Sequence, residues 1–236
     1  MKQAKILLAL LAIAGVIGLI SFLSSPYFQI RQINIQGLDK LQPATVREHI
    51  SYLDHKNIWL VSKNRVRYRL QEDNYIKQAK VYKKYPDQIV VQIREHIPLA
   101  KINNDGEYLV FDGSGYIIEK GPLTGRVEVP EIRGVAYGFD GDRLNFPPVL
   151  DELVQVLKSL NPSVRDRIKL IARREEDGLV LHLKQETRVL MGSPRDIKEK
   201  FRVLISVLDR QEKQGQQLDY VDLRLPARPV IKVQKD

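Results

Sequence analysis

The feature that most limits what this chain can form is an uninterrupted apolar run close to its first residue. Residues 6–23 contain no charged side chain, and Lys2 and Lys5 precede them. As a helix the run would span about 27 Å at about 1.5 Å per residue, close to the hydrocarbon thickness of a bilayer, about 30 Å. We therefore expect a single transmembrane helix over residues 6–24, preceded by a short cytoplasmic segment, residues 1–5.

A cleaved signal peptide is the competing interpretation of the apolar run. Such signals have an apolar core of about 7 to 15 residues that ends at small residues. The run here ends in SFLSSP at residues 21–26 without an A-x-A pattern, which favours an uncleaved anchor. Lys2 and Lys5 favour a cytoplasmic N-terminus by the positive-inside tendency. Residues 26–236 are therefore expected outside the cytoplasm.

The positive charge of the chain is concentrated in its first folded part. The chain has a formal net charge of +9, a value compatible with nucleic acid, an anionic membrane surface or a solvated basic face. Residues 28–97 hold 13 Lys or Arg against 7 Asp or Glu, which is +6 of that total. Because this part is expected outside the cytoplasm, nucleic acid is not an expected partner.

The clearest strand pattern lies in residues 75–100. Its second half, QIVVQIRE at residues 88–95, alternates apolar and polar side chains with the two-residue period of a strand buried on one face. A second alternating run at residues 79–82 precedes it, and YPDQ at residues 85–88 supplies a turn between the two. The segment is predicted to be a β-hairpin that ends where Pro98 interrupts the ladder.

Upstream of the hairpin, the pattern predicts one strand and two helices. Residues 28–35 read as a strand that ends at Gly37. A helix then opens at Pro43, in the first turn, where a missing N–H costs nothing, and it carries one apolar stripe. A second helix is expected over residues 62–71 with Ser62 as its N-cap.

Two features of this region concern its surface. Trp59 is interpreted as a core residue rather than a platform for a ligand. The second helix carries a basic face formed by Lys63, Arg65, Arg67 and Arg69. This face is either a solvated helix surface or a contact for anionic lipid head groups or an acidic partner, and both alternatives stay open.

From residue 98 onward the chain is expected to form an α+β domain with a mainly antiparallel sheet. Short apolar runs separated by glycine turns predict a series of hairpins. Two helices with apolar stripes are expected, one over residues 149–160 and one from the N-cap Ser193 to about Gln214. A sheet covered by two such helices has enough apolar side chains for a core of its own.

Six short motifs carry a resemblance to a known family. They are INIQG at 33–37, AKVYKKYP at 79–86, EHIPLA at 95–100, LVFDGSG at 109–115, VPEIRG at 129–134 and YVDLR at 220–224. In this order, and behind an N-terminal anchor, they resemble the FtsQ/DivIB family of bacterial cell-division proteins. Lys83 stands where that family usually has arginine, and either cation suits an exposed strand face.

The resemblance implies a fold and a function. The fold is α+β: a single N-terminal transmembrane helix, a POTRA domain (β-α-α-β-β) over residues 28–97, and a β domain over residues 98–236 with two packed helices. The function is that of a non-enzymatic, bitopic scaffold of the divisome in the cell (inner) membrane, enriched at the septum. Such a protein binds division proteins of the FtsB/DivIC and FtsL type and helps to assemble and regulate septal peptidoglycan synthesis.

In that family the partners add a strand to the C-terminal edge of the β domain, and the resemblance places this edge on the last strands of the chain. The candidate partner-binding residues are Tyr220, Asp222, Arg224, Leu225, Val230, Ile231 and Val233. Arg224 could pair with a carboxylate of the partner or with one inside the domain, and both alternatives stand. Pro226 and Pro229 leave the extent of the edge open.

No combination of residues predicts catalysis, a metal site or a cofactor. The four histidines lack metal-ligand spacing, and neither a G-x-S-x-G elbow nor a Walker loop occurs. The absence of cysteine excludes a disulfide framework. No small-molecule substrate is expected. The alternative functions are a POTRA-containing secretion or transport component that binds polypeptide substrates, and an anchored cell-wall hydrolase or transferase.

Overall fold

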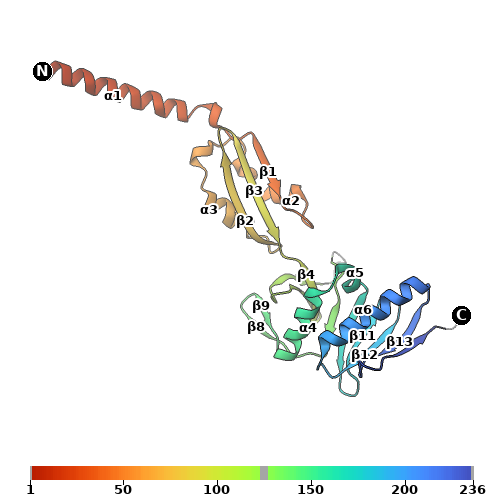
Figure 1. The fold of residues 1–236 in the computed structure, drawn as a ribbon. Helices are drawn as coiled ribbons and strands as arrows, with labels where there is room; N and C mark the ends of the chain where they lie inside the picture. Colours follow the sequence, from red (N-terminus) through yellow and green to blue (C-terminus); the bar gives the residue numbers. More distant parts are fainter. Residues whose placement is uncertain (1, 123–126, 235–236) are drawn as a thin grey trace. The chain divides into compact units, whose positions relative to one another are not determined.

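The structure is a computed structural model that describes residues 2–122 and 127–234. The chain divides into two compact units between His96 and Ile97 (Figure 1). The first unit contains an N-terminal helix and a small sheet with short helices, and the second contains a large sheet with two long helices. Each unit has its own buried apolar core.

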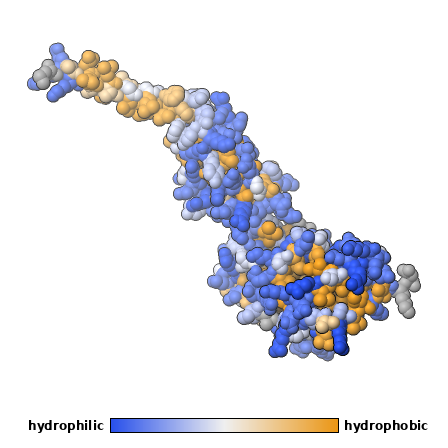
Figure 2. Space-filling model, viewed as in Figure 1, coloured by the Kyte–Doolittle hydropathy of each residue, from blue (hydrophilic) through white to orange (hydrophobic). Residues whose placement is uncertain are grey.

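The N-terminal helix α1 (Lys2–Leu23) is the one helix in the described part of the chain that is long and apolar enough to cross a membrane. None of its residues is buried against the rest of the protein. Figure 2 shows its surface as an almost unbroken apolar band. These properties are consistent with a single-pass membrane anchor.

The first unit contains a three-stranded sheet in the order β1–β3–β2. The central strand β3 (Gln88–Glu95) runs parallel to β1 (Gln32–Gln36) and antiparallel to β2 (Ile76–Lys84). Two helices, α2 (Pro43–His49) and α3 (Lys63–Leu70), follow β1 in the chain. The order β-α-α-β-β is therefore confirmed.

Alternation along β3 explains the core of this unit. Ile89 and Val91 are fully buried on the face that the helices cover, together with Val66 and Leu70 of α3. Ser62 caps α3 as predicted, because its Oγ accepts a hydrogen bond of 3.4 Å from the N–H of Arg65. Helices as short as α2 and α3 are barely stable by themselves in water. Their stability therefore depends on these apolar contacts with the sheet.

Glu95 at the end of β3 closes a loop that lies more than fifty residues earlier. Its carboxylate accepts hydrogen bonds from the backbone N–H groups of Asp39, Lys40 and Leu41 at 2.9, 2.8 and 3.2 Å. Three N–H groups on one carboxylate fix the chain between β1 and α2. The glutamate of the E-x-x-P-x-A motif thus has a structural role inside the first unit.

Two predictions for the first unit are corrected. The first strand begins at Gln32 rather than Phe28, since Pro26–Phe28 forms a 3-10 turn, η1. Trp59 is not a core residue, because 46% of it is exposed. It lies in a second 3-10 turn, η3 (Ile58–Leu60), where its ring reaches out over other aromatic rings.

The second unit contains a nine-stranded mixed sheet in the order β14–β13–β12–β11–β10–β7–β4–β5–β6. Its strands are β4 (Pro98–Asn104), β5 (Glu107–Asp112), β6 (Ile117–Gly121), β7 (Glu131–Arg133), β10 (Ile168–Arg174), β11 (Gly178–Leu183), β12 (Arg188–Gly192), β13 (Leu218–Asp222) and β14 (Val230–Val233). A separate hairpin consists of β8 (Gly138–Asp140) and β9 (Arg143–Asn145).

Antiparallel pairs predominate in this sheet, as predicted, but parallel pairs join its parts. Strand β7 lies between β4 and β10 and is parallel to both. Strand β12 is parallel to β13, and the helix α6 (Ile197–Gln214) connects the two. A parallel neighbour needs such a crossover, so the C-terminal end of the sheet depends on α6.

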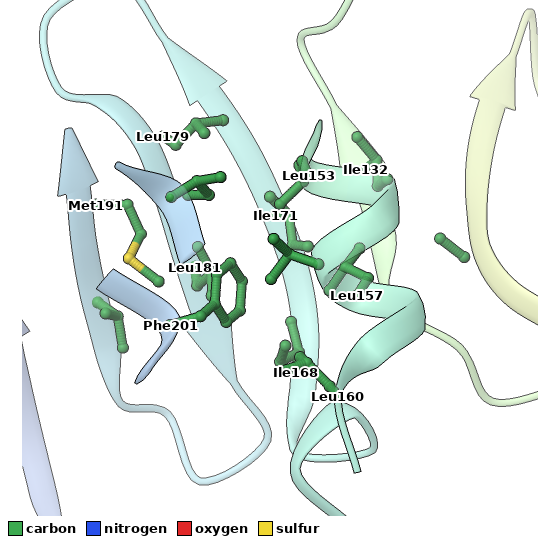
Figure 3. Close-up of a cluster of buried hydrophobic side chains, with 14 of the residues drawn as sticks. Ile132, Leu153, Leu157, Leu160, Ile168, Ile171, Leu179, Leu181, Met191 and Phe201 are labelled. Atoms are coloured by element: carbon green, nitrogen blue, oxygen red, sulfur yellow. The ribbon is translucent and has the colours of Figure 1, made fainter. Parts of the chain in front are cut away.

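Two helices pack against one face of the sheet, α4 (Pro148–Ser159) and α6, and a short helix α5 (Pro162–Arg165) follows α4. Figure 3 shows Leu153 and Leu157 of α4 and Phe201 of α6 facing Ile171 and Leu181 of the sheet. This layered core was expected from the two apolar stripes. It holds the strands that lead to the C-terminal edge.

The start of α6 differs from its prediction. The helix begins at Ile197, and its N-cap residue is Asp196, which has a φ of +58°, rather than Ser193. Ser193 instead accepts a hydrogen bond of 2.6 Å at its carbonyl oxygen from Nζ of Lys200. The serine-proline pair therefore forms the turn ahead of the helix and not its first residues.

Candidate functional site: the C-terminal sheet edge

Strand β14 forms one edge of the nine-stranded sheet. It pairs only with β13, in the antiparallel sense, among the strands that the structure describes. In an antiparallel pair, every second residue points its N–H and C=O away from the neighbouring strand. The outer side of β14 therefore offers backbone donors and acceptors to a further strand.

The register between β13 and β14 assigns the side chains to two faces. Val221 lies opposite Ile231, and Asp222 lies opposite Val230. Val221 is fully buried in the core beneath the helices, so Ile231 belongs to that face. Val230 lies on the other face and is 60% exposed.

Leu225 and the two prolines lie outside both strands. Leu225 is among the most exposed apolar side chains of the second unit. Its carbonyl oxygen accepts a hydrogen bond of 2.9 Å from the N–H of Arg228, which closes the turn between β13 and β14. Pro226 and Pro229 belong to this connection, so the edge strand itself is Val230–Val233.

Asp222 organises a polar cluster on the face that carries Val230. Its carboxylate accepts hydrogen bonds from the backbone N–H of Arg224 at 3.0 Å and from its Nη2 at 2.6 Å. The hydroxyl of Tyr220 donates to the same carboxylate at 3.2 Å. The bond from Arg224 holds the pKa of Asp222 below its usual range. Burial, and then the charge of Asp222, raises the pKa of Tyr220.

The internal alternative for Arg224 is thus the one observed, while its guanidinium remains at the surface. The side chain is 56% exposed although it is paired with Asp222. Paired in this way, the fork is held in one direction instead of sampling many rotamers. It can still donate from its outer side to a second carboxylate.

Sequence reasoning missed two neighbours of this cluster. Gly192, at the end of β12, has a φ of +65°, and a Cβ there would lie 2.8 Å from Cγ of Arg224. The aliphatic stem of Arg224 therefore occupies the space that a side chain would take. Arg188 lies opposite Tyr220 and donates to Asp177 at 2.6 Å. For Gly192 the only sign in the sequence was a glycine before a turn. For Arg188 no nearby residue indicates that it lies beside Tyr220.

The structure brings the seven candidate residues to one corner of the sheet. Tyr220, Asp222 and Arg224 form one hydrogen-bonded cluster, and the others lie on the adjoining turn and edge strand. No group of three or more His, Cys, Asp or Glu side chains in the described ranges could hold a metal ion. The corner combines an edge strand with the exposed guanidinium of Arg224.

Comparison with known proteins agrees with this architecture. Residues 28–96 match the POTRA domain of the FtsQ type, and residues 100–224 match the C-terminal domain of the cell-division protein FtsQ/DivIB. The second match ends at Arg224, so β14 lies beyond it.

Two curated relatives are similar over most of their length. The cell-division protein DivIB of Clostridium acetobutylicum is 25% identical over 90% of this chain and 86% of its own. DivIB of Clostridium tetani is 19% identical over 87% of this chain and 80% of its own. The solved major extracytoplasmic domain of DivIB from Geobacillus stearothermophilus is 17% identical over 40% of this chain and 76% of its own, with a TM-score of 0.30, so the family assignment does not depend on it.

The two family matches cover nearly all of the chain after its apolar helix. They occur in the order in which the structure places the small sheet and the large one. Because the C-terminal match alone spans more than half of the chain, this protein belongs to the FtsQ/DivIB family of bitopic, non-enzymatic bacterial cell-division proteins.

Proposed function

We propose that the protein is a bitopic scaffold that holds other division proteins at the septum through strand addition to β14. Helix α1 anchors it in the cell membrane with residues 1–5 in the cytoplasm, and both units lie outside. The partners are proteins of the FtsB/DivIC and FtsL type, and their capture helps to assemble and regulate septal peptidoglycan synthesis. The observation that carries the proposal is the exposed outer edge of β14, with which no other strand in the described part of the chain pairs.

The side chains of the edge support this mode of binding. An added strand takes its affinity from backbone hydrogen bonds, each with a net value of about 1 kcal/mol, and its specificity from the side chains on the two faces. Val230 and Ile231 provide apolar contacts on opposite faces. Four residues allow only a few backbone bonds, so these apolar contacts carry much of the selectivity.

Charge near the edge indicates what the partner carries. Arg224, Arg188 and Lys232 lie on the face of Val230, and Lys232 is paired with Asp219 at 2.7 Å. A lysine on an edge strand also discourages pairing between copies of the same protein. We infer that the partner strand is flanked by acidic residues, which meet the outer side of the Arg224 guanidinium.

Membership in the FtsQ/DivIB family favours division over the transport and hydrolase alternatives. A transport component would receive unfolded chains on the small sheet of the first unit. The scaffold proposal instead assigns partner capture to the second unit, so the two functions predict different sensitive residues.

The proposal is tested by removing residues 230–236 from the full-length protein in its native host. This deletion leaves the buried Val221 and Leu223 in place, so the core of the second unit is kept. We expect loss of septal localisation and of coprecipitation with the two partner types. Retained capture by the deleted protein would show that β14 is not the docking strand.

A finer pair of variants separates binding from folding. Val230→Glu places a negative charge on the exposed face of the edge, whereas Phe139→Ser changes an exposed apolar residue of β8 elsewhere in the same unit. We expect the first to lower partner affinity by at least about tenfold and the second to leave it unchanged, with thermal unfolding unchanged in both. Equal affinity of the two variants would contradict the assignment.

A further inference from the structure

Aromatic rings from four separate segments gather at the end of the first unit that is next to α1. Phe22 of α1 contacts Phe28 of η1 with ring centroids 5.2 Å apart. Phe28 contacts Trp59 of η3 at 5.8 Å, and Trp59 stacks on Tyr85 of the β2–β3 turn at 4.3 Å. Tyr27 lies beside Phe28 at 5.2 Å. We refer to these five residues as the aromatic cluster.

The outer side of the aromatic cluster is open to its surroundings. Phe28 is buried, but Tyr27, Trp59 and Tyr85 are each about half exposed. Leu60, next to Trp59, is 87% exposed. Single apolar side chains at a surface are ordinary, whereas a contiguous row of aromatic rings with a leucine beside it marks a site of contact.

The cluster is tied to the end of the apolar helix. Nδ2 of Asn57 donates a hydrogen bond of 2.6 Å to the carbonyl oxygen of Leu23, the last residue of α1. Oδ1 of the same Asn57 accepts from the N–H of Trp59 at 2.9 Å. One side chain therefore joins the helix terminus to the turn that carries Trp59. Figure 1 shows the β2–β3 turn beside this end of α1.

Two lysines, Lys63 and Lys83, border the cluster. Nζ of Lys83 donates to the carbonyl oxygen of Trp59 at 3.4 Å. Burial lowers the pKa of Lys83, and repulsion from Lys63 lowers it further. Two ammonium groups that repel each other are stabilised by an anion placed between them.

We propose that the aromatic cluster, with Leu60, Lys63 and Lys83, is a second membrane contact that seats the first unit in the head-group region of the outer face of the membrane. Trp59, Tyr85 and Leu60 enter the interface, where amphipathic rings are favoured, and the two lysines bind phosphates of anionic phospholipids. This proposal rests on the membrane-spanning role of α1 proposed above. The surface that the cluster contacts is the bilayer, because the cluster lies at the end of α1, where that helix enters the membrane.

The tryptophan content of the chain makes the proposal directly measurable. Trp59 is the single tryptophan, so intrinsic emission reports this position alone. The full-length protein is reconstituted into vesicles of phosphatidylcholine and phosphatidylglycerol whose acyl chains carry bromine either close to the head group or close to the chain end. We expect blue-shifted emission, and quenching at least about twofold stronger by the shallow bromines than by the deep ones.

Leu60→Asp is the test variant and Phe139→Asp, in the second unit, is its matched control. Leu60 is almost fully exposed, so its replacement leaves the core of the first unit unchanged. We expect Leu60→Asp to reduce shallow quenching by about half or more, and Phe139→Asp to leave it as in the wild type. Replacing phosphatidylglycerol with phosphatidylcholine should weaken quenching in the wild type.

Three results would overturn the proposal. Emission of Trp59 that is open to aqueous acrylamide and insensitive to bromine would show that the cluster faces water. Equal quenching in the wild type and Leu60→Asp would show that α1 alone sets the distance. Extraction of the protein from vesicles at alkaline pH would refute the anchor itself, and partner capture by β14 in detergent separates that failure from a failure of the scaffold proposal.

Discussion

Replacement of Gly192 by alanine probes the corner of the sheet without replacing any of the residues proposed to contact a partner. Gly192 has a φ of +65°, and a Cβ there would lie 2.8 Å from Cγ and 3.4 Å from Cβ of Arg224. Cγ sits near the base of that side chain, so Arg224 cannot avoid the methyl group by moving its tip. The variant must therefore move the arginine stem, and with it the guanidinium that donates to Asp222.

The magnitude follows from two additive costs. An alanine in the left-handed region costs about 1–2 kcal/mol. The steric conflict with the stem adds about 1–3 kcal/mol, the usual range for overpacking. Gly141 provides the matched control, because its φ is +57° and nothing lies within 4 Å of its Cβ position. Gly141→Ala should therefore show the cost of the left-handed backbone without the steric cost.

The assay is chemical unfolding of both full-length variants in detergent, followed by circular dichroism, with hydrogen exchange of peptides that cover β13. We expect Gly192→Ala to lose about 1–3 kcal/mol more than Gly141→Ala. Exchange should accelerate in residues 218–224 of the first variant alone. Equal losses of unfolding free energy in the two variants, with unchanged exchange protection of β13, would refute the inference that the Arg224 stem packs directly against Gly192.

Three further predictions concern single interactions. The pKa of Asp222 is lowered in the folded protein, so the stability that its ionised carboxylate contributes is complete above about pH 4 and is lost as the pH falls through the folded pKa. The difference in free energy of unfolding between wild type and Asp222→Asn, measured by urea unfolding, should therefore shrink between pH 7 and pH 3. Phe201→Ala should cost about 3–5 kcal/mol in calorimetry because the side chain is fully buried, whereas exposed Leu225→Ala should cost less than about 0.5 kcal/mol. Glu95→Ala should cost about 1–3 kcal/mol and accelerate amide exchange at residues 39–41, because their N–H groups lose their acceptor.

Local patterns were sufficient wherever a contact depends on neighbours in sequence. The alternation of β3 predicted its buried face, and the Ser62 cap predicted the start of α3. The order of short motifs led to the family, which the comparisons show. Each of these features depends on residues that are close in sequence or on the order of short motifs, so each can be predicted without the tertiary structure.

Contacts between distant segments could not be read in this way. Strand β7 is three residues long, too short for a pattern, and it is defined by its two parallel neighbours. Trp59 was expected in the core because it is a large apolar residue. In the structure its ring instead stacks on Tyr85 of the β2–β3 turn, a contact that the sequence does not show. Arg224 is a similar case. Whether it pairs with a carboxylate of a partner or with one inside the domain depends on the direction of the Asp222 side chain, which the sequence does not give.

The position of β14 in the chain has a consequence for how the protein matures. Strands β4 to β12 and helix α6 all precede β13 and β14 in the order of synthesis. The parallel pair β12–β13 requires α6 to be in place, and β14 then pairs with β13. The proposed docking strand is thus the last strand of the sheet along the described chain. If β14 is the docking strand, a chain that is clipped before residue 230 keeps strands β4 to β13 yet presents no place for a partner.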